Sequence, residues 1–155
     1  MTDIIAHTME YKGGLVQSHV SLIHYSDDHF YEYKRVYEDC FHAMRMALGL
    51  NPVDACDSRE ELLEKRNDIY VYIENGVFIG SVAIYKNEID DLIVARDYQR
   101  KGYGEMMLHF AITRMQEANT DPIILHVADW NKQAIKLYLK NNFVITKTET
   151  VKRTL

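Results

Sequence analysis

The sequence predicts an α/β protein built around a mixed β-sheet. Turn signals typical of antiparallel hairpins dominate the first part of the chain. Helical and strand-like patterns then alternate in the second part, which is typical of strands joined by helical crossovers. The two prolines and six of the seven glycines lie at or between the ends of these elements, and no linker or repeat interrupts them. We therefore expect one sheet with both kinds of pairing, in a single domain over residues 1–155.

Composition limits the classes of protein to which the chain can belong. With 47% hydrophobic and 26% charged residues, it can bury a sizeable core and is not a disordered segment. Its net charge of −5 argues against a nucleic-acid-binding module, which usually carries a basic face. No apolar run approaches the roughly 20 residues of a membrane span, and the first residues lack the pattern of a signal peptide. Two cysteines without a CxxC spacing favour a reduced, cytoplasmic protein.

The N-terminal segment predicts a hairpin. Two strand-like runs, 4–11 and 15–25, flank Gly13 and Gly14. A Gly-Gly pair can supply the positive φ angles that a tight turn requires. The sequence therefore predicts an extra N-terminal strand at about 4–11, paired with the segment that follows it.

Two helices are expected next. After Ser26, large apolar residues recur at three- and four-residue steps up to Leu48, and Gly49 fits the end of this helix. Ser58 and Glu61 then form a capping box, which predicts a second, shorter helix.

The second half of the chain predicts a hairpin followed by alternating strands and helices. Asn75-Gly76 is the strongest turn signal in the chain, and it joins the strands expected at 69–73 and 77–85. A further strand is expected at 88–94. The remaining elements should be helix 104–117, strand 123–127, helix 131–141 and strand 143–151.

A glycine-rich loop precedes the helix that begins near Gly104. Gly102 and Gly104 allow the backbone to approach a ligand closely, and the first N–H groups of the helix lack intrahelical acceptors. Together with Arg100 and Lys101, these groups could form a cradle for a diphosphate. The loop has neither the P-loop pattern nor the third glycine of a Rossmann fingerprint. On the glycines alone, a solvent-facing turn is the simpler interpretation.

Two motifs in this order resemble those of the GNAT superfamily of N-acetyltransferases. The family's acetyl-CoA loop, Q/R-x-x-G-x-G/A, is matched by Gln99, Gly102 and Gly104. The second motif, an Asn that opens the last helix and then A-x-x-x-Y, is matched within residues 131–138. The resemblance implies a GNAT-like fold, with a central mixed, mostly antiparallel sheet flanked by about four helices.

The chain departs from the family pattern in three places. Arg96 stands where a proline is common, and Asn142 replaces the glycine before Phe143. Asn is the next-best residue for a left-handed helix terminus, so the local geometry should survive. Only twelve residues follow Phe143. The family's closing two-strand hairpin should therefore be shortened, with the extra N-terminal strand altering an edge of the sheet.

The resemblance implies direct transfer of the acetyl group of acetyl-CoA to a primary amine. Main-chain groups at Leu92 and Val94 would bind the pantetheine arm, and a backbone N–H there would polarise the acetyl carbonyl. Asn131 would contact the same arm. The diphosphate would lie in the loop made by Gln99, Arg100, Lys101, Gly102, Tyr103 and Gly104.

The resemblance also implies two catalytic residues. Tyr138 matches the family's usual general acid, which gives its proton to the departing thiolate. Glu88 lies eleven residues before Gln99, the spacing of the glutamate base in histone-acetylating members. Simpler interpretations stay open. Tyr138 could be a packed residue of an amphipathic helix, and Glu88 could belong to a solvated acidic turn, with a water chain as the base.

No motif identifies the acceptor. A small-molecule amine is one option, a protein N-terminus or lysine is a second, and a non-catalytic acyl-CoA-binding sensor is a third. Acidic residues near the expected acceptor groove favour a cationic amine. They are Asp54, Asp57, Glu60, Glu61 and Glu64 around the second helix, and Glu88, Asp90 and Asp91 on the central strand.

Metal ions, nucleic acid and membranes are not expected as partners. The seven histidines occur without an HExxH pattern or matching cysteines, so no metal site is expected. Dimers are common among proteins of this fold, and the predicted N-terminal hairpin is a candidate edge for a homodimer.

Overall fold

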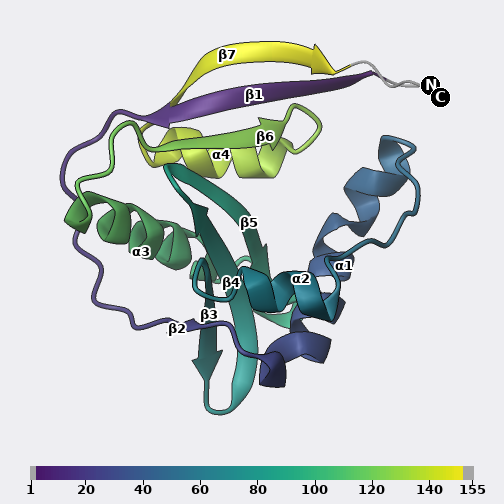
Figure 1. Ribbon diagram of the computed structural model, residues 1–155. Helices are drawn as coiled ribbons and strands as arrows, with labels where there is room; N and C mark the ends of the chain where they lie inside the picture. The colour runs from purple at the N-terminus through teal and green to yellow at the C-terminus, as the bar shows by residue number, and fades with distance from the viewer. Residues whose placement is uncertain (1–2, 152–155) are drawn as a thin grey trace.

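Seven β-strands form one mixed sheet in the order β2-β3-β4-β5-β6-β1-β7 (Figure 1). The computed structural model describes residues 3–151. Only β5 and β6 pair in parallel, and all other neighbours are antiparallel. The strands are β1 (Ile4–Tyr11), β2 (Ile23–His24), β3 (Ile69–Glu74), β4 (Val77–Tyr85), β5 (Glu88–Val94), β6 (Ile124–Ala128) and β7 (Phe143–Val151). The helices are α1 (Phe30–Ala47), α2 (Arg59–Glu64), α3 (Tyr103–Glu117) and α4 (Lys132–Lys140), with short 3-10 turns η1 (Asp27–His29) and η2 (Arg96–Tyr98). The predicted mixed, mostly antiparallel sheet with four helices is confirmed.

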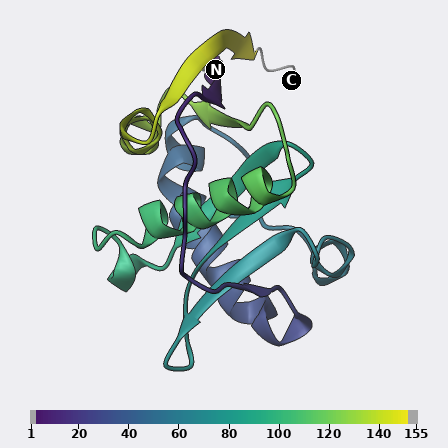
Figure 2. The same cartoon turned by 90° about the vertical axis from the view of Figure 1, so that its left-hand side faces the viewer.

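Helices cover both faces of the sheet and create two separate cores. On one face, α3 buries Met107, Leu108 and Ile112 against the sheet, and α4 packs at the edge of the same core (Figure 1). On the opposite face, α1 and α2 pack through a second cluster that includes Tyr33 and Leu62. Figure 2 shows α3 lying across the sheet. Within residues 3–151, no helix has the length and apolar character needed to cross a membrane.

One local turn signal and one local helix-start signal are confirmed. Asn75 and Gly76 both have positive φ, 52° and 76°, and they join β3 to β4. Ser58 Oγ accepts a hydrogen bond from the Glu61 N–H at 3.1 Å, and the Glu61 carboxylate accepts one from the Ser58 N–H at 3.0 Å. This capping box begins α2 as predicted.

The predicted N-terminal hairpin is wrong. Residues 4–11 do form β1, but β1 pairs with β6 on one side and β7 on the other. Both edges of β1 are therefore occupied, and residues 15–22 have no strand edge on which to pair. Neither Gly13 nor Gly14 adopts a positive φ. The segment instead runs past α3 (Figure 2), where Val16 exchanges hydrogen bonds with the Gln116 and Thr113 side chains.

The N-terminal strand therefore lies inside the sheet instead of at its edge. β1 lies between β6 and β7, and β7 is the only strand after α4 in the described part of the chain. The expected shortening of the closing hairpin is confirmed. β2 and β7 are the edge strands. The N-terminal strand is thus excluded as the edge of a homodimer.

Candidate active site

The parallel strands β5 and β6 separate after their first residues and leave a wedge between them. They pair only at Glu88 with Ile124 and at Ile89 with Leu125. A β-bulge in β5 follows, because three steps along β5 oppose two steps along β4. The extra residue lies near Asp91, whose φ is 49°. Beyond Ile89, the β6-facing main chain of β5 has no strand partner within residues 3–151.

A cavity of about 550 Å³ fills this wedge. Seven of the predicted site residues line it, and they come from β5, the glycine-rich loop, and α4 with the residue before it. They are Leu92, Val94, Gln99, Arg100, Gly104, Asn131 and Tyr138. Helix α1 contributes Cys40, Phe41 and Met44 from the other side. The structure thus brings together residues that lie up to about 100 positions apart in the sequence.

The glycine-rich loop has the geometry of an anion cradle. Arg100 and Gly102 have φ values of 62° and 90°, so the chain turns sharply before α3 begins at Tyr103. In the described structure, the N–H groups of residues 103–105 donate to no protein acceptor. Free amides at a helix N-terminus attract anionic oxygens. Gln99 Nε2 donates to the Val94 carbonyl at 2.9 Å, which ties the loop to β5.

Lys101, Gly102 and Tyr103 do not line the cavity and form the outer part of the loop. The Lys101 ammonium lies 5.7 Å from the centre of the Tyr98 ring. The Tyr103 ring lies 6.0 Å from Tyr98 and 5.9 Å from Tyr72. These contacts support the loop from outside.

Replacing Gly102 with valine should weaken acetyl-CoA binding by at least tenfold in calorimetry. A Cβ at Gly102 meets no atom within 4 Å, so the substitution acts through its φ of 90°, which valine strongly disfavours. The loop should relax and misdirect its amides. Gly76→Val is the matched control, because Gly76 also has open space and a positive φ but lies in the β3–β4 turn. The control should lose stability and keep its affinity. Equal affinities for Gly102→Val and wild type would remove the loop from the binding site.

Asn131 and Tyr138 reach the cavity from opposite ends of α4. The Asn131 side-chain oxygen accepts a hydrogen bond from the Ala134 N–H at 3.2 Å, so it caps the helix and leaves its amide NH₂ for other partners. The Tyr138 ring packs edge-on against Phe143 at 5.9 Å. Burial, helped by the charge of Asp90, raises the pKa of Tyr138 to about 12. The phenol is therefore protonated at neutral pH.

Asp91 is the most strongly perturbed carboxyl group of the site. Burial raises the pKa of Asp91 to about 7, and the neighbouring charge of Asp90 adds to this effect. The Tyr37 hydroxyl donates a hydrogen bond to Asp91 at 3.2 Å, which opposes the shift. A carboxyl group with a pKa near 7 can accept and release a proton at physiological pH.

A second hollow of about 370 Å³ meets the cavity at Asp90 and Asp91. The two spaces share these residues together with Phe41 and Met44. The hollow is lined on its far side by the segment between α1 and α2, including Asp57, whose carboxylate binds the Lys65 ammonium at 2.6 Å. Asp90 and Asp91 thus lie between two spaces, each large enough for a small molecule.

Glu88 lies outside the cavity. It occupies the first position of β5, where β5 and β6 are still paired, and its carboxylate contacts the His126 ring on β6. His126 itself does line the cavity. Spacing alone selected Glu88 as the base, whereas Asp91 was predicted only as part of the acidic field near the acceptor and Tyr37 was missed. The sequence signal for a buried carboxyl group was the pair of consecutive acids, Asp90 and Asp91, inside an apolar strand. The bulge in β5 lets the Asp91 side chain reach Tyr37 on α1.

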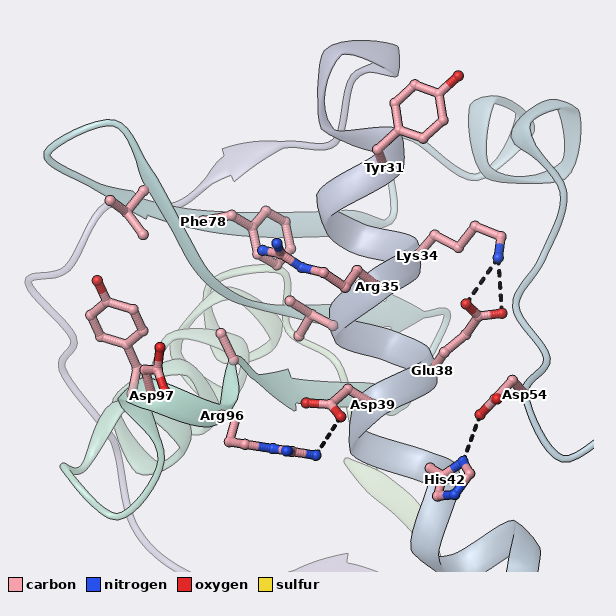
Figure 3. A pocket seen from close by; sticks show the side chains of 14 residues that line it. Tyr31, Lys34, Arg35, Glu38, Asp39, His42, Asp54, Phe78, Arg96 and Asp97 are labelled. Carbon is pink, nitrogen blue, oxygen red and sulfur yellow. Dashed lines mark hydrogen bonds and ion pairs between the residues drawn. The ribbon is translucent and has the colours of Figure 1, made fainter.

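A wider hollow of about 970 Å³ lies between α1, β4 and η2 and lacks this chemistry (Figure 3). Six of its charged or titratable side chains form three pairs, whereas Arg35 and Asp97 also line it. Asp39 binds Arg96 at 2.6 Å, His42 binds Asp54 at 2.8 Å and Lys34 binds Glu38 at 2.9 Å (Figure 3). Within residues 3–151, no three His, Cys, Asp or Glu side chains lie close enough together to hold a metal ion.

Comparisons with known proteins identify the family of the chain. The model of the acetyltransferase (GNAT) family matches residues 25–143. Streptothricin acetyltransferase A from Bacillus subtilis is 35% identical over 85 residues, which cover 52% of this chain and 49% of that protein. The chain therefore matches about half the length of this curated relative.

Solved structures share the fold at low sequence identity. A protein from Novosphingobium aromaticivorans, assigned to the GNAT acetyltransferases, gives a TM-score of 0.70 at 16% identity over 99% of this chain and 67% of that chain. The PaiA N-acetyltransferase from Thermoplasma acidophilum, solved in complex with coenzyme A, gives 0.64 at 16% identity over 84% and 98% of the two chains. The family model, which matches more than half of the chain, identifies the protein: it belongs to the GNAT family of acetyltransferases.

Proposed function

We propose that the protein transfers the acetyl group of acetyl-CoA directly to a primary amine of a small cationic molecule. One observation carries the proposal. Asp91, with a pKa of about 7, lies at the bulge of β5, where the wedge cavity meets the second hollow. A base between two adjoining spaces suits a reaction that joins two substrates.

The residues of the wedge fit acetyl-CoA. Beyond Ile89, β5 has no partner strand within residues 3–151 on its β6-facing side, so its main chain near Leu92 and Val94 could bond an amide-containing arm as a neighbouring strand would. The Val94 carbonyl already accepts a hydrogen bond from Gln99, so the arm would use the other main-chain groups of this segment. The amides at the start of α3, beside Arg100, offer donors to a diphosphate. Asn131 also lines the cavity and can donate from its NH₂. When bound, acetyl-CoA would supply an activated thioester for attack by an amine.

Asp91 and Tyr138 have complementary proton-transfer roles in the proposed reaction. The Asp91 carboxylate takes a proton from the ammonium form of the acceptor, which makes the amine nucleophilic. A backbone N–H of β5 stabilises the negative charge that develops on the acetyl oxygen. The amine nitrogen forms the new C–N bond, and as the C–S bond breaks, the Tyr138 phenol, still protonated at neutral pH, gives its proton to the sulfur. The phenolate then takes the second proton from the nitrogen that becomes the amide, which restores Tyr138.

Charge and size favour a small cationic acceptor. Asp57, Asp90 and Asp91 line the second hollow, while Tyr37 and Phe41 offer aromatic faces to a cation. The similar protein from Bacillus subtilis is named for the acetylation of streptothricin, which supports a small-molecule amine over a protein amine. The protonated Tyr138 and the titratable Asp91 favour catalysis over a sensor that only binds.

A screen for free CoA release tests the proposal. Purified protein with acetyl-CoA should release CoA in the presence of polyamines, aminoglycosides or streptothricin-type amines. Peptides with a free N-terminus and neutral or anionic amines should give little release. Turnover of peptides alone would favour the protein-amine alternative. Binding of acetyl-CoA without release by any amine would favour the sensor.

Salt should weaken the capture of the acceptor. Raising ionic strength from about 0.05 to 0.5 M should increase KM for a cationic amine by roughly three- to tenfold, because screening shortens the reach of the acidic field. kcat should change little once the acceptor is bound. Steady-state kinetics with saturating acetyl-CoA measure both values. A KM that does not respond to salt would contradict an electrostatic acceptor site.

A further inference from the structure

His7 is a buried polar residue in the middle of β1, and both of its ring nitrogens have partners. It faces Val127 of β6 across the sheet, so its side chain lies on the same face as Val127, which α4 covers (Figure 1). The ring contacts the Asp129 carboxylate through Nε2 and the Thr148 hydroxyl through Nδ1, each at 2.8 Å. Burying a polar ring costs free energy unless its hydrogen bonds are made, so these two contacts are what allow His7 to lie in the core.

Asp129 opens the short loop between β6 and α4, residues 129–131. One oxygen of its carboxylate contacts the His7 ring, and the other accepts a hydrogen bond from the Lys132 ammonium at 2.9 Å. The hydrogen bond from His7, followed by that from Lys132, lowers the pKa of Asp129, so the group is a carboxylate at neutral pH. A carboxylate only accepts, and the Nε2 of His7 is therefore the donor. Asp129 thus ties the loop to the N-terminal strand.

Asn131 closes the same loop and lines the wedge cavity. Its side-chain oxygen is engaged by the Ala134 N–H, so its NH₂ group is the part that can meet the pantetheine arm. Its own N–H donates to the Ala128 carbonyl at 2.9 Å, which makes the loop a tight turn. A shift of Asp129 is carried directly to Asn131, because only one residue separates them.

The opposite end of α4 is held by other contacts. The Asn141 side chain donates to the Glu105 carboxylate at 3.0 Å and accepts from the His109 ring at 2.7 Å. The Tyr138 ring packs against Phe143. None of these contacts involves the loop that His7 supports, so Tyr138 should keep its place when the contact between His7 and Asp129 is lost.

We propose that His7 is a positioning residue for acetyl-CoA: through Asp129, it fixes the loop that aims the Asn131 amide at the pantetheine arm. The inference rests on the proposed acetyl-CoA site in the wedge cavity. It gives the N-terminal strand a part in binding the donor, although His7 itself does not line the cavity. The loss of His7 should therefore weaken binding of the arm and leave proton transfer at Tyr138 unchanged.

Calorimetry with acetyl-CoA tests this role. His7→Leu has a side chain of similar size and removes both ring contacts, and it should raise Kd by roughly three- to tenfold, which corresponds to about one hydrogen bond. His7→Gln can still donate to Asp129 and should keep the wild-type Kd. Thr148→Val is the matched control, because it removes only the contact at Nδ1, and it should lose a little stability and keep its affinity. At saturating acetyl-CoA, kcat should stay at the wild-type value in all three variants.

A second variant breaks the same link from the loop side. Asp129→Ala changes a partly exposed residue, keeps the sheet intact and should raise Kd for acetyl-CoA as His7→Leu does. ADP, which has the diphosphate and lacks the arm, should bind both variants as it binds wild type. Circular dichroism should show the wild-type fold in each.

A double-mutant cycle tests whether His7 acts through Asn131. Asn131→Ser keeps an oxygen that can cap α4 and removes the NH₂ group. If His7 works through this group, His7→Leu should have little further effect on Kd once residue 131 is serine. Full additivity, an equal loss of ADP affinity, or a wild-type Kd in both His7→Leu and Asp129→Ala would each overturn the inference. A wild type that does not bind acetyl-CoA would overturn the proposed function, and this inference with it.

Discussion

Replacing Asp91 with asparagine is expected to lower kcat/KM for a cationic amine by about 10²- to 10³-fold. Asparagine keeps the size of the side chain and can still accept the hydrogen bond from Tyr37, but it cannot take a proton from the acceptor. The wild-type kcat/KM should rise with pH through about 7, as the carboxyl group ionises. Stopped assays of CoA release across pH 5 to 9 measure both effects.

The same substitution should stabilise the fold at alkaline pH. Folding raises the pKa of Asp91 from about 3.8 to about 7, so the folded state holds a proton that the unfolded state has lost. The free energy of unfolding of wild type therefore falls as pH rises through this range. The Asp91→Asn variant has no carboxyl group at this position and escapes that loss. Its stability advantage should be near zero at pH 4 and on the order of 1–3 kcal/mol at pH 8, measured by urea denaturation.

Glu88→Gln is the control that separates the two candidate bases. Glu88 lies outside the cavity and contacts His126, so its loss should reduce kcat/KM only a few-fold. The rise of kcat/KM with pH through about 7 should stay as in wild type. If Glu88→Gln abolished this pH dependence of kcat/KM and Asp91→Asn kept it, the base would be Glu88, as the sequence spacing indicates.

Sequence predicted the fold wherever the deciding interaction was local. Asn75-Gly76 makes a turn with its own φ angles, and Ser58 with Glu61 caps a helix within one turn. The N-terminal hairpin failed because its outcome depended on distant segments. Strand β1 pairs with residues more than a hundred positions away, which leaves no edge for residues 15–22.

The same distinction between local and distant interactions explains which residues of the candidate site could be predicted. The loop glycines and α4 could be placed from motifs, and the structure brings Gly104, Asn131 and Tyr138 to one cavity. Asp91 could not be identified, because simple alternation along a strand assigns each side chain to a face, and a bulge changes the alternation. The bulge is visible only in the pairing of β5 with β4. The burial that mainly raises the Asp91 pKa is likewise visible only in the folded structure.

Replacing Tyr138 with phenylalanine should lower kcat by about 10²- to 10³-fold and leave the Kd for acetyl-CoA unchanged. The phenol has no hydrogen-bond partner among the described residues, so its loss removes no internal hydrogen bond and should cost little stability. With a pKa of about 12, the wild-type phenol remains an acid across the whole neutral range. The departing thiolate would then lack its proton donor in the variant, and kcat should fall for every acceptor alike.

Tyr11→Phe provides the matched control for this loss. The Tyr11 ring also packs against Phe143, at 5.4 Å, but its hydroxyl donates to the Gly14 carbonyl away from the cavity. It should keep kcat while losing a little stability. Single-turnover measurements with bound acetyl-CoA separate chemistry from product release. If Tyr138→Phe and Tyr11→Phe both retained the wild-type single-turnover rate, Tyr138 would be a packing residue of α4, and the thiolate would have to take its proton from solvent.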